Sequence, residues 1–296
     1  MNAQSVRFKV GDFTCIAVRD GEFNYPVESF FAGVPREKIE TALRIHGLPT
    51  RRIATPYTCL FVDTGLHKVM IDTGAGNLSD EARQLFPSID HTTTVTGLLQ
   101  KSLTDAGVSR VEIDTVIITH AHPDHVGGTL NEAGHLVFPN ASYCVSRDEH
   151  DFWFNDVNLK HESGMMRELT RIARLNLDAM GDRMEILEGA VEIVPGIHAI
   201  STPGHTPGHI ALSIKSNGEQ LLHISDVVLH PLHLEHPDWV PVFDISPLHA
   251  AQSKQMIFDK AANENALVFA HHFPPFPNVG HVLKQHTGWL WQPLDL

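Results

Sequence analysis

The residues best suited to chemistry stand together in one short run, His120-Ala121-His122-Pro123-Asp124-His125. The run follows the apolar segment 116–118 and precedes two glycines, which indicates a strand that ends and delivers four potential ligands into a tight turn. Imidazole and carboxylate groups suit zinc and other divalent first-row metals. Two histidines separated by one residue can bind one ion if the turn brings them together. The Asp-His pair then points to a second ion beside the first.

Four other apolar segments also end in a potential ligand or in a residue that could support one. These ends are Asp72 after 69–71, His205 after 198–204, Asp226 after 221–225, and the pair His271-His272 after 267–270. Ligands gathered at strand ends along one sheet edge would form a metal site in a rigid frame. Neighbours in an extended segment point opposite ways, so only one of the two adjacent histidines is expected to face the metal.

The runs HAHPDH, TPGHTPGH, SD and AHH, in this order and spacing, resemble the metallo-β-lactamase superfamily. The resemblance covers roughly residues 63–281. It implies an α/β fold, the αββα sandwich of two mixed β-sheets flanked by helices, formed by residues 1–296 as a single domain. It also implies two divalent metal ions at one edge of the sheets, with Zn²⁺ expected and Mn²⁺, Co²⁺ or Fe²⁺ as alternatives.

The same resemblance implies a role for each ligand. One ion would take His120, His122 and His205, and the other would take Asp124, His125 and His271, with Asp226 bridging both. Asp72 matches a family position that supports the ligands from behind. His209 is the alternative ligand if His205 fails.

A pair of divalent ions lowers the pKa of bound water and polarises a carbonyl or phosphoryl oxygen. The resemblance therefore implies a hydrolase in which a metal-bridging hydroxide attacks a lactone or an aryl ester. Asp124 or Asp226 would pass a proton towards the leaving oxygen. The sequence holds no GxSxG elbow that would indicate a serine nucleophile.

Residues 230–239 and 270–282 resemble the branch that contains methyl parathion hydrolase and related lactone or aryl-ester hydrolases. The alternatives are an organophosphate triester hydrolase, an N-acyl homoserine lactonase and a glyoxalase-like thioesterase. Outside the hydrolases stand a mono-iron persulfide dioxygenase and a metal-dependent binding protein. Some N-acyl homoserine lactonases place a tyrosine three residues after the bridging aspartate. This chain has Leu229 there, which favours other lactones or aryl esters.

Several residues next to the ligand segments are candidates for the substrate pocket, because apolar and aromatic side chains commonly line small-molecule sites. They are Leu229, His230, Trp239, Phe273 and Phe276.

The amino-acid composition and the charge indicate which kinds of substrate or partner the protein can bind. About 42% of the 296 residues are hydrophobic, enough for a sizeable core, and the formal net charge of -13 disfavours a nucleic-acid partner. The three cysteines form no CxxC pair, and Cys59 and Cys144 lie in apolar runs typical of a core. We expect a small-molecule substrate, no membrane association and a cytoplasmic location. The sequence leaves a homodimer open.

Short strands and helices that alternate along the chain must position these residues. Strands are predicted at 13–18, 57–62, 68–71, 115–119, 142–145, 197–201, 210–214, 221–224 and 267–270. Helices are predicted at 94–106, 147–154, 165–176 and 247–262. Asn217-Gly218 predicts a hairpin turn. Residues 24–55 are weakly periodic and read as a loop or arm that covers another part of the molecule, with a role that the sequence does not give.

Overall fold

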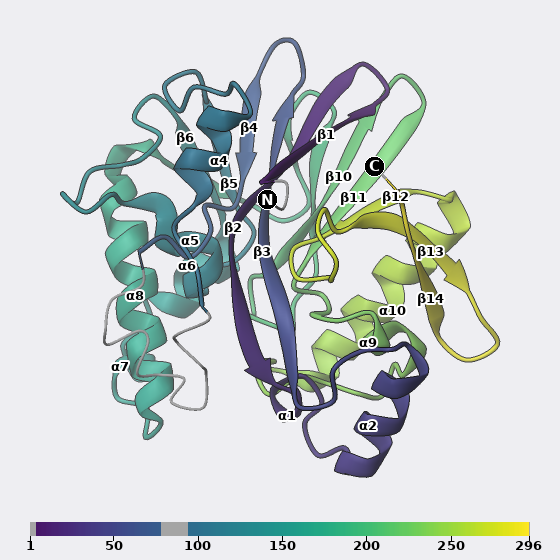
Figure 1. Ribbon diagram of the computed structural model, residues 1–296. Coiled ribbons are helices and arrows are strands. Elements are labelled where there is room, and N and C mark those ends of the chain that lie inside the picture. Colours follow the sequence, from purple (N-terminus) through teal and green to yellow (C-terminus); the bar gives the residue numbers. More distant parts are fainter. Residues whose placement is uncertain (1–3, 78–93, 296) are drawn as a thin grey trace.

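The structure of the chain, a computed structural model, describes residues 4–77 and 94–295. Within these residues two seven-stranded β-sheets pack face to face, and helices cover their outer faces (Figure 1). Each half of the chain builds one sheet, and the strands of each sheet lie side by side in chain order. This arrangement confirms the predicted αββα sandwich.

The first sheet is formed by the N-terminal half of the chain. Its strands are β1 (Ser5–Val10), β2 (Phe13–Pro26), β3 (Arg52–Asp63), β4 (Lys68–Ile71), β5 (Thr115–Ile118), β6 (Ser142–Ser146) and β7 (Met184–Leu187). The second sheet contains β8 (Glu192–Val194), β9 (Ile197–Ser201), β10 (Ile210–Ser216), β11 (Glu219–Ser225), β12 (Leu267–Ala270), β13 (Val279–Lys284) and β14 (Trp289–Pro293).

The α-helices in the described residues vary from one turn to eighteen residues. They are α1 (Val27–Phe30), α2 (Arg36–Ile45), α4 (Leu99–Asp105), α5 (Pro123–Val126), α6 (Arg147–Trp153), α7 (Asp156–Leu159), α8 (Gly164–Met180), α9 (Leu232–Glu235) and α10 (Pro247–Glu264). Buried side chains of α4, α6 and α8 pack on the first sheet, and those of α10 pack on the second. None of the helices in this part of the chain combines the length and apolar character that a membrane span requires.

Alternation along the strands separates the apolar layers. On β2, Cys15 and Ala17 belong to the cluster between the two sheets, whereas Ile16 and Val18 belong to the cluster beneath the helices of the first sheet. Successive strand residues point to opposite faces, so one strand supplies both layers. Cys15, Cys59 and Cys144 are all buried and unpaired, which confirms that Cys59 and Cys144 are core residues.

The pairing of the strands determines where the chain can place a site. β4, β5 and β6 are parallel neighbours in the first sheet, and β11 and β12 are parallel neighbours in the second. Parallel neighbours end at the same edge of a sheet, so the segments after β4 and β5 lie together in the first sheet, and those after β11 and β12 lie together in the second. These segments carry Asp72 and every candidate ligand except His205, which follows β9.

The predicted elements agree well with the observed ones. Each predicted strand lies within an observed strand or overlaps it, and β4, β9 and β12 have the predicted bounds. The predicted helix 94–106 is shorter, because α4 begins only at Leu99. Asn217 and Gly218 both adopt positive φ, as the hairpin turn requires.

The arm 24–55 consists of the end of β2, the helices α1 and α2, and the start of β3. Its apolar side chains form a separate cluster with Leu229, Leu232 and Trp239 from the segment after β11. The arm therefore closes one side of the region that the ligand segments occupy.

Candidate metal centre and adjoining cavity

The run HAHPDH forms the turn after β5. The chain enters the one-turn helix α5 with His122 at the N-cap and Pro123 at the first helical position. Proline suits that position because its fixed φ is helical and its missing N–H has no intrahelical partner to lose. The turn therefore holds Asp124 and His125 on a rigid element that directly follows a buried strand.

The glycines after the run allow this turn to approach the loop that follows β4. A Cβ atom added to Gly128 would lie 2.0 Å from the carbonyl oxygen of Thr73. The backbone N–H of Thr73 in turn donates to the carbonyl oxygen of His125, at 2.7 Å. The two ligand-bearing loops are thus joined backbone to backbone, which only glycine permits at this separation.

Three histidines form the first group of candidate ligands. Nδ1 of His122 lies 3.2 Å from Nε2 of His120 and 2.9 Å from Nε2 of His205. Burial and the neighbouring His205 lower the pKa of His122 to about 3, and burial also lowers the pKa of His120. Neutral imidazoles are the form that binds metal, and three convergent ring nitrogens suit one ion.

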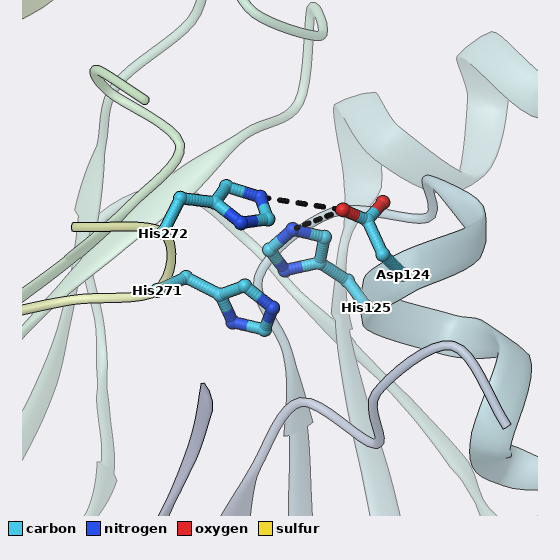
Figure 2. Close-up of side chains that lie close together, drawn as sticks. All are labelled: Asp124, His125, His271 and His272. Atoms are coloured by element: carbon cyan, nitrogen blue, oxygen red, sulfur yellow. Dashed lines mark ion pairs between the residues drawn. The ribbon is translucent and has the colours of Figure 1, made fainter. Parts of the chain in front are cut away.

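The second group contains Asp124, His125, His271 and His272. Figure 2 shows the rings of His125 and His272 directed at the carboxylate of Asp124. Nε2 of His272 lies 3.2 Å from Asp124 Oδ2, and Nε2 of His125 lies 3.9 Å from the same oxygen. Against the effect of burial, Asp226 and Asp124 raise the pKa of His272 to about 9. The carboxylates thus create a local potential that attracts a cation.

The two adjacent histidines after β12 differ in what they face. His272 points towards Asp124 and Asp226, whereas the carboxylate oxygen closest to His271 among the recorded ion pairs belongs to Asp72, at 3.9 Å. The ring of His271 packs on that of His125, with centroids 4.0 Å apart, and neither of its nitrogens makes a hydrogen bond in the described residues. Burial and the neighbouring His125 lower the pKa of His271, so it is the neutral form that binds metal, and a cation would supply a partner for its buried nitrogens. His271 therefore stays the predicted ligand, with His272 as the alternative in the same group.

Asp226, which follows β11, lies between the two groups. Its Oδ2 is 3.3 Å from Nε2 of His205 and 3.3 Å from Nε2 of His272. Its Oδ1 is 3.3 Å from Nε2 of His125, yet neither of these two buried atoms makes a hydrogen bond in the described part of the chain. Buried polar atoms normally have partners, and a cation on each side of Asp226 would supply them. The donor set therefore fits two divalent metal ions.

Asp72 supports this centre from behind. Its Oδ2 lies 2.8 Å from Nδ1 of His125, and its Oδ1 accepts the backbone N–H of Thr119 at 2.8 Å. A carboxylate that holds one ring nitrogen of a histidine fixes the tautomer and turns the other nitrogen towards the metal. The observed contact agrees with the supporting role that the family resemblance implies.

Two further residues, which the sequence pattern does not indicate, support the first group. Asp244 Oδ1 lies 3.0 Å from Nδ1 of His205. Buried Glu149 on α6 accepts hydrogen bonds from the backbone of Ala121, from Trp153 and from Thr206, at 2.5 to 2.7 Å. Glu149 thereby joins the loops that carry the first group. Glu149 lies within the predicted helix after β6, and Asp244 lies in the loop before α10, so neither stands out in the sequence as a strand end does.

A cavity of about 330 Å³ adjoins the centre. Its polar floor contains His122, Asp124, His205, Asp226 and His272. Its walls are largely apolar and come from α1, α8 and the segments after β11. The apolar wall residues are Phe30, Met165, Met166, Leu169, Leu229, Val242, Phe243 and Ile245. A polar, charged floor with apolar walls suits a ligand that has one reactive polar end and one apolar end.

Of the five predicted pocket residues, the structure places only Leu229 on this cavity. Phe273 lies in the core beneath α10, with its ring 5.1 Å from that of Trp291. Phe276 lies in a separate surface hollow near the C-terminus. Trp239 stacks on His236, 4.0 Å between centroids, and His230 is buried between two phenylalanines of the arm. Proximity in sequence to a ligand thus did not bring these four side chains to the cavity.

Comparison with known proteins agrees with this geometry. The family model of the metallo-beta-lactamase superfamily matches residues 52–271, which contain every candidate ligand described above except His272. The chain belongs to the metallo-β-lactamase superfamily. The match covers strands β3 to β12, which belong to both sheets, and the ligand-bearing segments after β5, β9 and β11, so family, fold and site agree.

Individual members of the superfamily resemble the chain over most of its length. An N-acyl homoserine lactonase from Bacillus thuringiensis is 27% identical over 236 residues, which cover 76% of this chain and 84% of the relative. The solved structure of AidC, a dizinc quorum-quenching lactonase in complex with a product, N-hexanoyl-L-homoserine, covers 100% of this chain and 99% of its own. Its TM-score is 0.88 at 27% identity. A probable metal-dependent hydrolase from Staphylococcus aureus, with a TM-score of 0.79 at 22% identity, shares the fold.

Proposed function

We propose that this chain is a metal-dependent lactonase that opens the ring of a lactone bearing an apolar group. The observation that carries the proposal is the convergence of two ligand groups on the floor of one apolar-walled cavity. The similarity to N-acyl homoserine lactonases, and to a dizinc lactonase across the whole chain, supports a lactone as the substrate. Methyl parathion hydrolase resembles the chain in its motifs, but the relatives described above favour lactones over phosphotriesters.

For the ligands we propose two sets. One ion would be held by His120, His122 and His205, the other by Asp124, His125 and His271, and Asp226 would contact both. His272, whose Nε2 already has the carboxylates of Asp124 and Asp226 as partners, is the alternative to His271. Zinc suits these imidazole and carboxylate ligands, and AidC is a dizinc enzyme.

When bound, the two ions would supply water activation and polarisation of the substrate carbonyl. The side chains around them orient the reaction. Asp124 lies on the cavity floor and is the more exposed of the two central carboxylates, so its Oδ2 can hold a proton and release it to the leaving ring oxygen. Water adds to the carbonyl carbon, the ring C–O bond breaks, and the proton from water ends on the alcohol of a hydroxy acid.

The apolar walls would position the rest of the substrate. Met165, Met166 and Leu169 project from α8, and Phe243 and Ile245 come from the segment before α10. Small-molecule clefts span roughly 300–1,000 Å³, so a cavity of about 330 Å³ suits a compact ligand. An N-acyl homoserine lactone fits this description, since it joins a lactone ring to an apolar acyl chain.

The test compares substrate classes at one metal loading. Protein with two equivalents of zinc is assayed with N-acyl homoserine lactones of several chain lengths, an aryl lactone, an aryl ester, a thioester and a phosphotriester. We expect the highest kcat/KM for a lactone. A phosphotriester or thioester that exceeds every lactone by tenfold, or oxygen consumption with a persulfide at a single bound iron, would contradict the proposal.

A further inference from the structure

Two tyrosines from neighbouring strands meet beside the centre. Tyr25 lies on β2 and Tyr57 on β3, and their hydroxyl oxygens are 2.5 Å apart. Both side chains are buried, at 7% and 2% exposure. The pair therefore forms a close hydrogen bond that solvent scarcely reaches. No step described above uses it.

The pair reaches the cavity from the side of the arm. Tyr25 lines the cavity, whereas Tyr57 lies behind it, with its ring 5.3 Å from that of His272. The carboxylates of Asp124 and Asp226 lie near enough to act electrostatically on both hydroxyls. Tyr25 thus lines the same cavity as these two carboxylates.

Aromatic packing fixes the direction of the Tyr25 ring. Phe23, Phe30 and Phe243 surround it, with ring centroids 5.3, 5.4 and 5.7 Å from its own. Side chains locked by packing provide the orientation that a catalytic group needs. The ring of Tyr25 is therefore held in one direction on the cavity wall, with its hydroxyl against that of Tyr57.

The chemistry of the pair limits how its two protons are shared. A tyrosine hydroxyl ordinarily has a pKa of about 10, so both hydroxyls carry a proton at neutral pH. Each hydroxyl has one proton, so only one can donate to the other. If Tyr57 donates, it occupies an acceptor site of Tyr25, and the Tyr25 proton is directed to an acceptor other than Tyr57.

We propose that the Tyr25 hydroxyl, oriented by Tyr57, donates a hydrogen bond to an oxygen of the scissile ester on which negative charge develops. Tyr25 would be the catalytic residue and Tyr57 a positioning residue. The proton stays on Tyr25 throughout, so the step requires no co-reactant. The proposal rests on the lactonase function given above. It adds a hydrogen-bond donor of the protein to the groups that act on the substrate. A preorganised donor of this kind stabilises the charge of the transition state most strongly in a site that excludes water.

The experiment uses the three tyrosines of the chain as a matched set. Tyr25→Phe, Tyr57→Phe and the double variant are compared with Tyr143→Phe, whose hydroxyl donates to the carbonyl of Phe138 in the core. Each zinc-loaded protein is assayed on the best lactone, with metal content and melting temperature measured in parallel. The Tyr143→Phe control removes a buried hydroxyl without touching the cavity.

We expect Tyr25→Phe to lower kcat by about tenfold to hundredfold, the range for a hydrogen bond to a charged group, with KM changed by less than about threefold. Metal content should remain that of the wild type. The double variant should be no slower than Tyr25→Phe alone, because Tyr57 acts only through Tyr25. Tyr143→Phe should lower the melting temperature and leave kcat unchanged.

Three outcomes would overturn the role of the pair. The first is a Tyr25→Phe enzyme with unchanged kcat. The second is a double variant whose loss is the product of the two single losses. The third is a loss of metal that accounts for the loss of rate. If the wild type itself opens no lactone, the proposed function has failed, whereas a normal wild type with an unaffected Tyr25→Phe refutes only the tyrosine pair.

Discussion

Replacing Asp244 tests whether the first group of histidines binds metal in the way proposed. Asp244 Oδ1 lies 3.0 Å from Nδ1 of His205, and both side chains are almost fully buried. The carboxylate holds the proton on Nδ1, which leaves the lone pair of Nε2 facing His122 and Asp226. Removing the carboxylate should therefore weaken the binding of metal by His205, although Asp244 is not itself a proposed ligand.

The size of the effect follows from the contact that is lost. Outer partners of metal-bound histidines contribute about 10- to 100-fold to metal affinity. Asp244→Asn keeps an acceptor oxygen but removes the charge, so we expect a loss near the lower limit, about tenfold. Asp244→Ala removes the acceptor as well and should approach about a hundredfold, which corresponds to about 2.7 kcal/mol.

Zinc affinity is measured by competition with a chromophoric chelator. Asp238→Asn provides the matched control, because Asp238 lies in the same loop, is exposed and does not line the cavity. The control should bind both ions as the wild type does. Equal affinity in Asp244→Asn, Asp244→Ala and the control would refute the reasoning, since His205 would then not depend on its carboxylate.

Two further predictions separate the cavity from the core. Leu169→Ala should lower kcat/KM for long-chain acyl lactones by about tenfold or less, and leave a lactone without an acyl chain unaffected, because Leu169 belongs to the apolar wall that we propose holds the chain. Phe273→Ala should lower the free energy of unfolding by about 3–5 kcal/mol while KM stays unchanged, because Phe273 is buried under α10 and not on the cavity.

Both predictions are checked by kinetics over a chain-length series and by urea unfolding. An equal loss of kcat/KM for all chain lengths in Leu169→Ala would remove α8 from substrate binding. A changed KM in a stably folded Phe273→Ala would instead restore the pocket role that the sequence suggested.

The ligands were predictable from the sequence because the signal is local. Asp72 and Asp226 each follow an apolar strand, and His120 follows one after a single intervening residue. A strand that ends in a polar residue can be recognised without knowledge of its neighbours. Parallel pairing then brings these ends together, and the order of the motifs along the chain indicates the family.

The sequence pattern alone does not determine the choice between His271 and His272. Neighbours in an extended segment point opposite ways, but the sequence does not say which way the sheet edge faces. The pairing of β11 with β12 shifts between His223 and Ser225, next to this point, so counting along the strand could not settle the orientation either.

The cavity wall and Asp244 depend on contacts distant in sequence. Leu169 lies on α8 and Phe30 on the arm, far along the chain from any ligand of the second group. The sequence predicted a helix around Leu169, but helical periodicity shows only that one face is apolar and not which surface that face covers. Phe273 was misplaced for the related reason that an aromatic residue near a ligand serves a core equally well.

The most direct test of the two-ion centre is the metal content of three proteins prepared under metal-replete conditions. The wild type should bind about two zinc ions per chain, His271→Ala about one, and His272→Ala about two, provided that circular dichroism shows all three to be folded. This order follows from the buried ring nitrogens of His271, which have no hydrogen-bond partner in the described residues, whereas Nε2 of His272 has the carboxylates of Asp124 and Asp226. A wild type that saturates at one ion, or a loss of metal in His272→Ala but not in His271→Ala, would contradict the account.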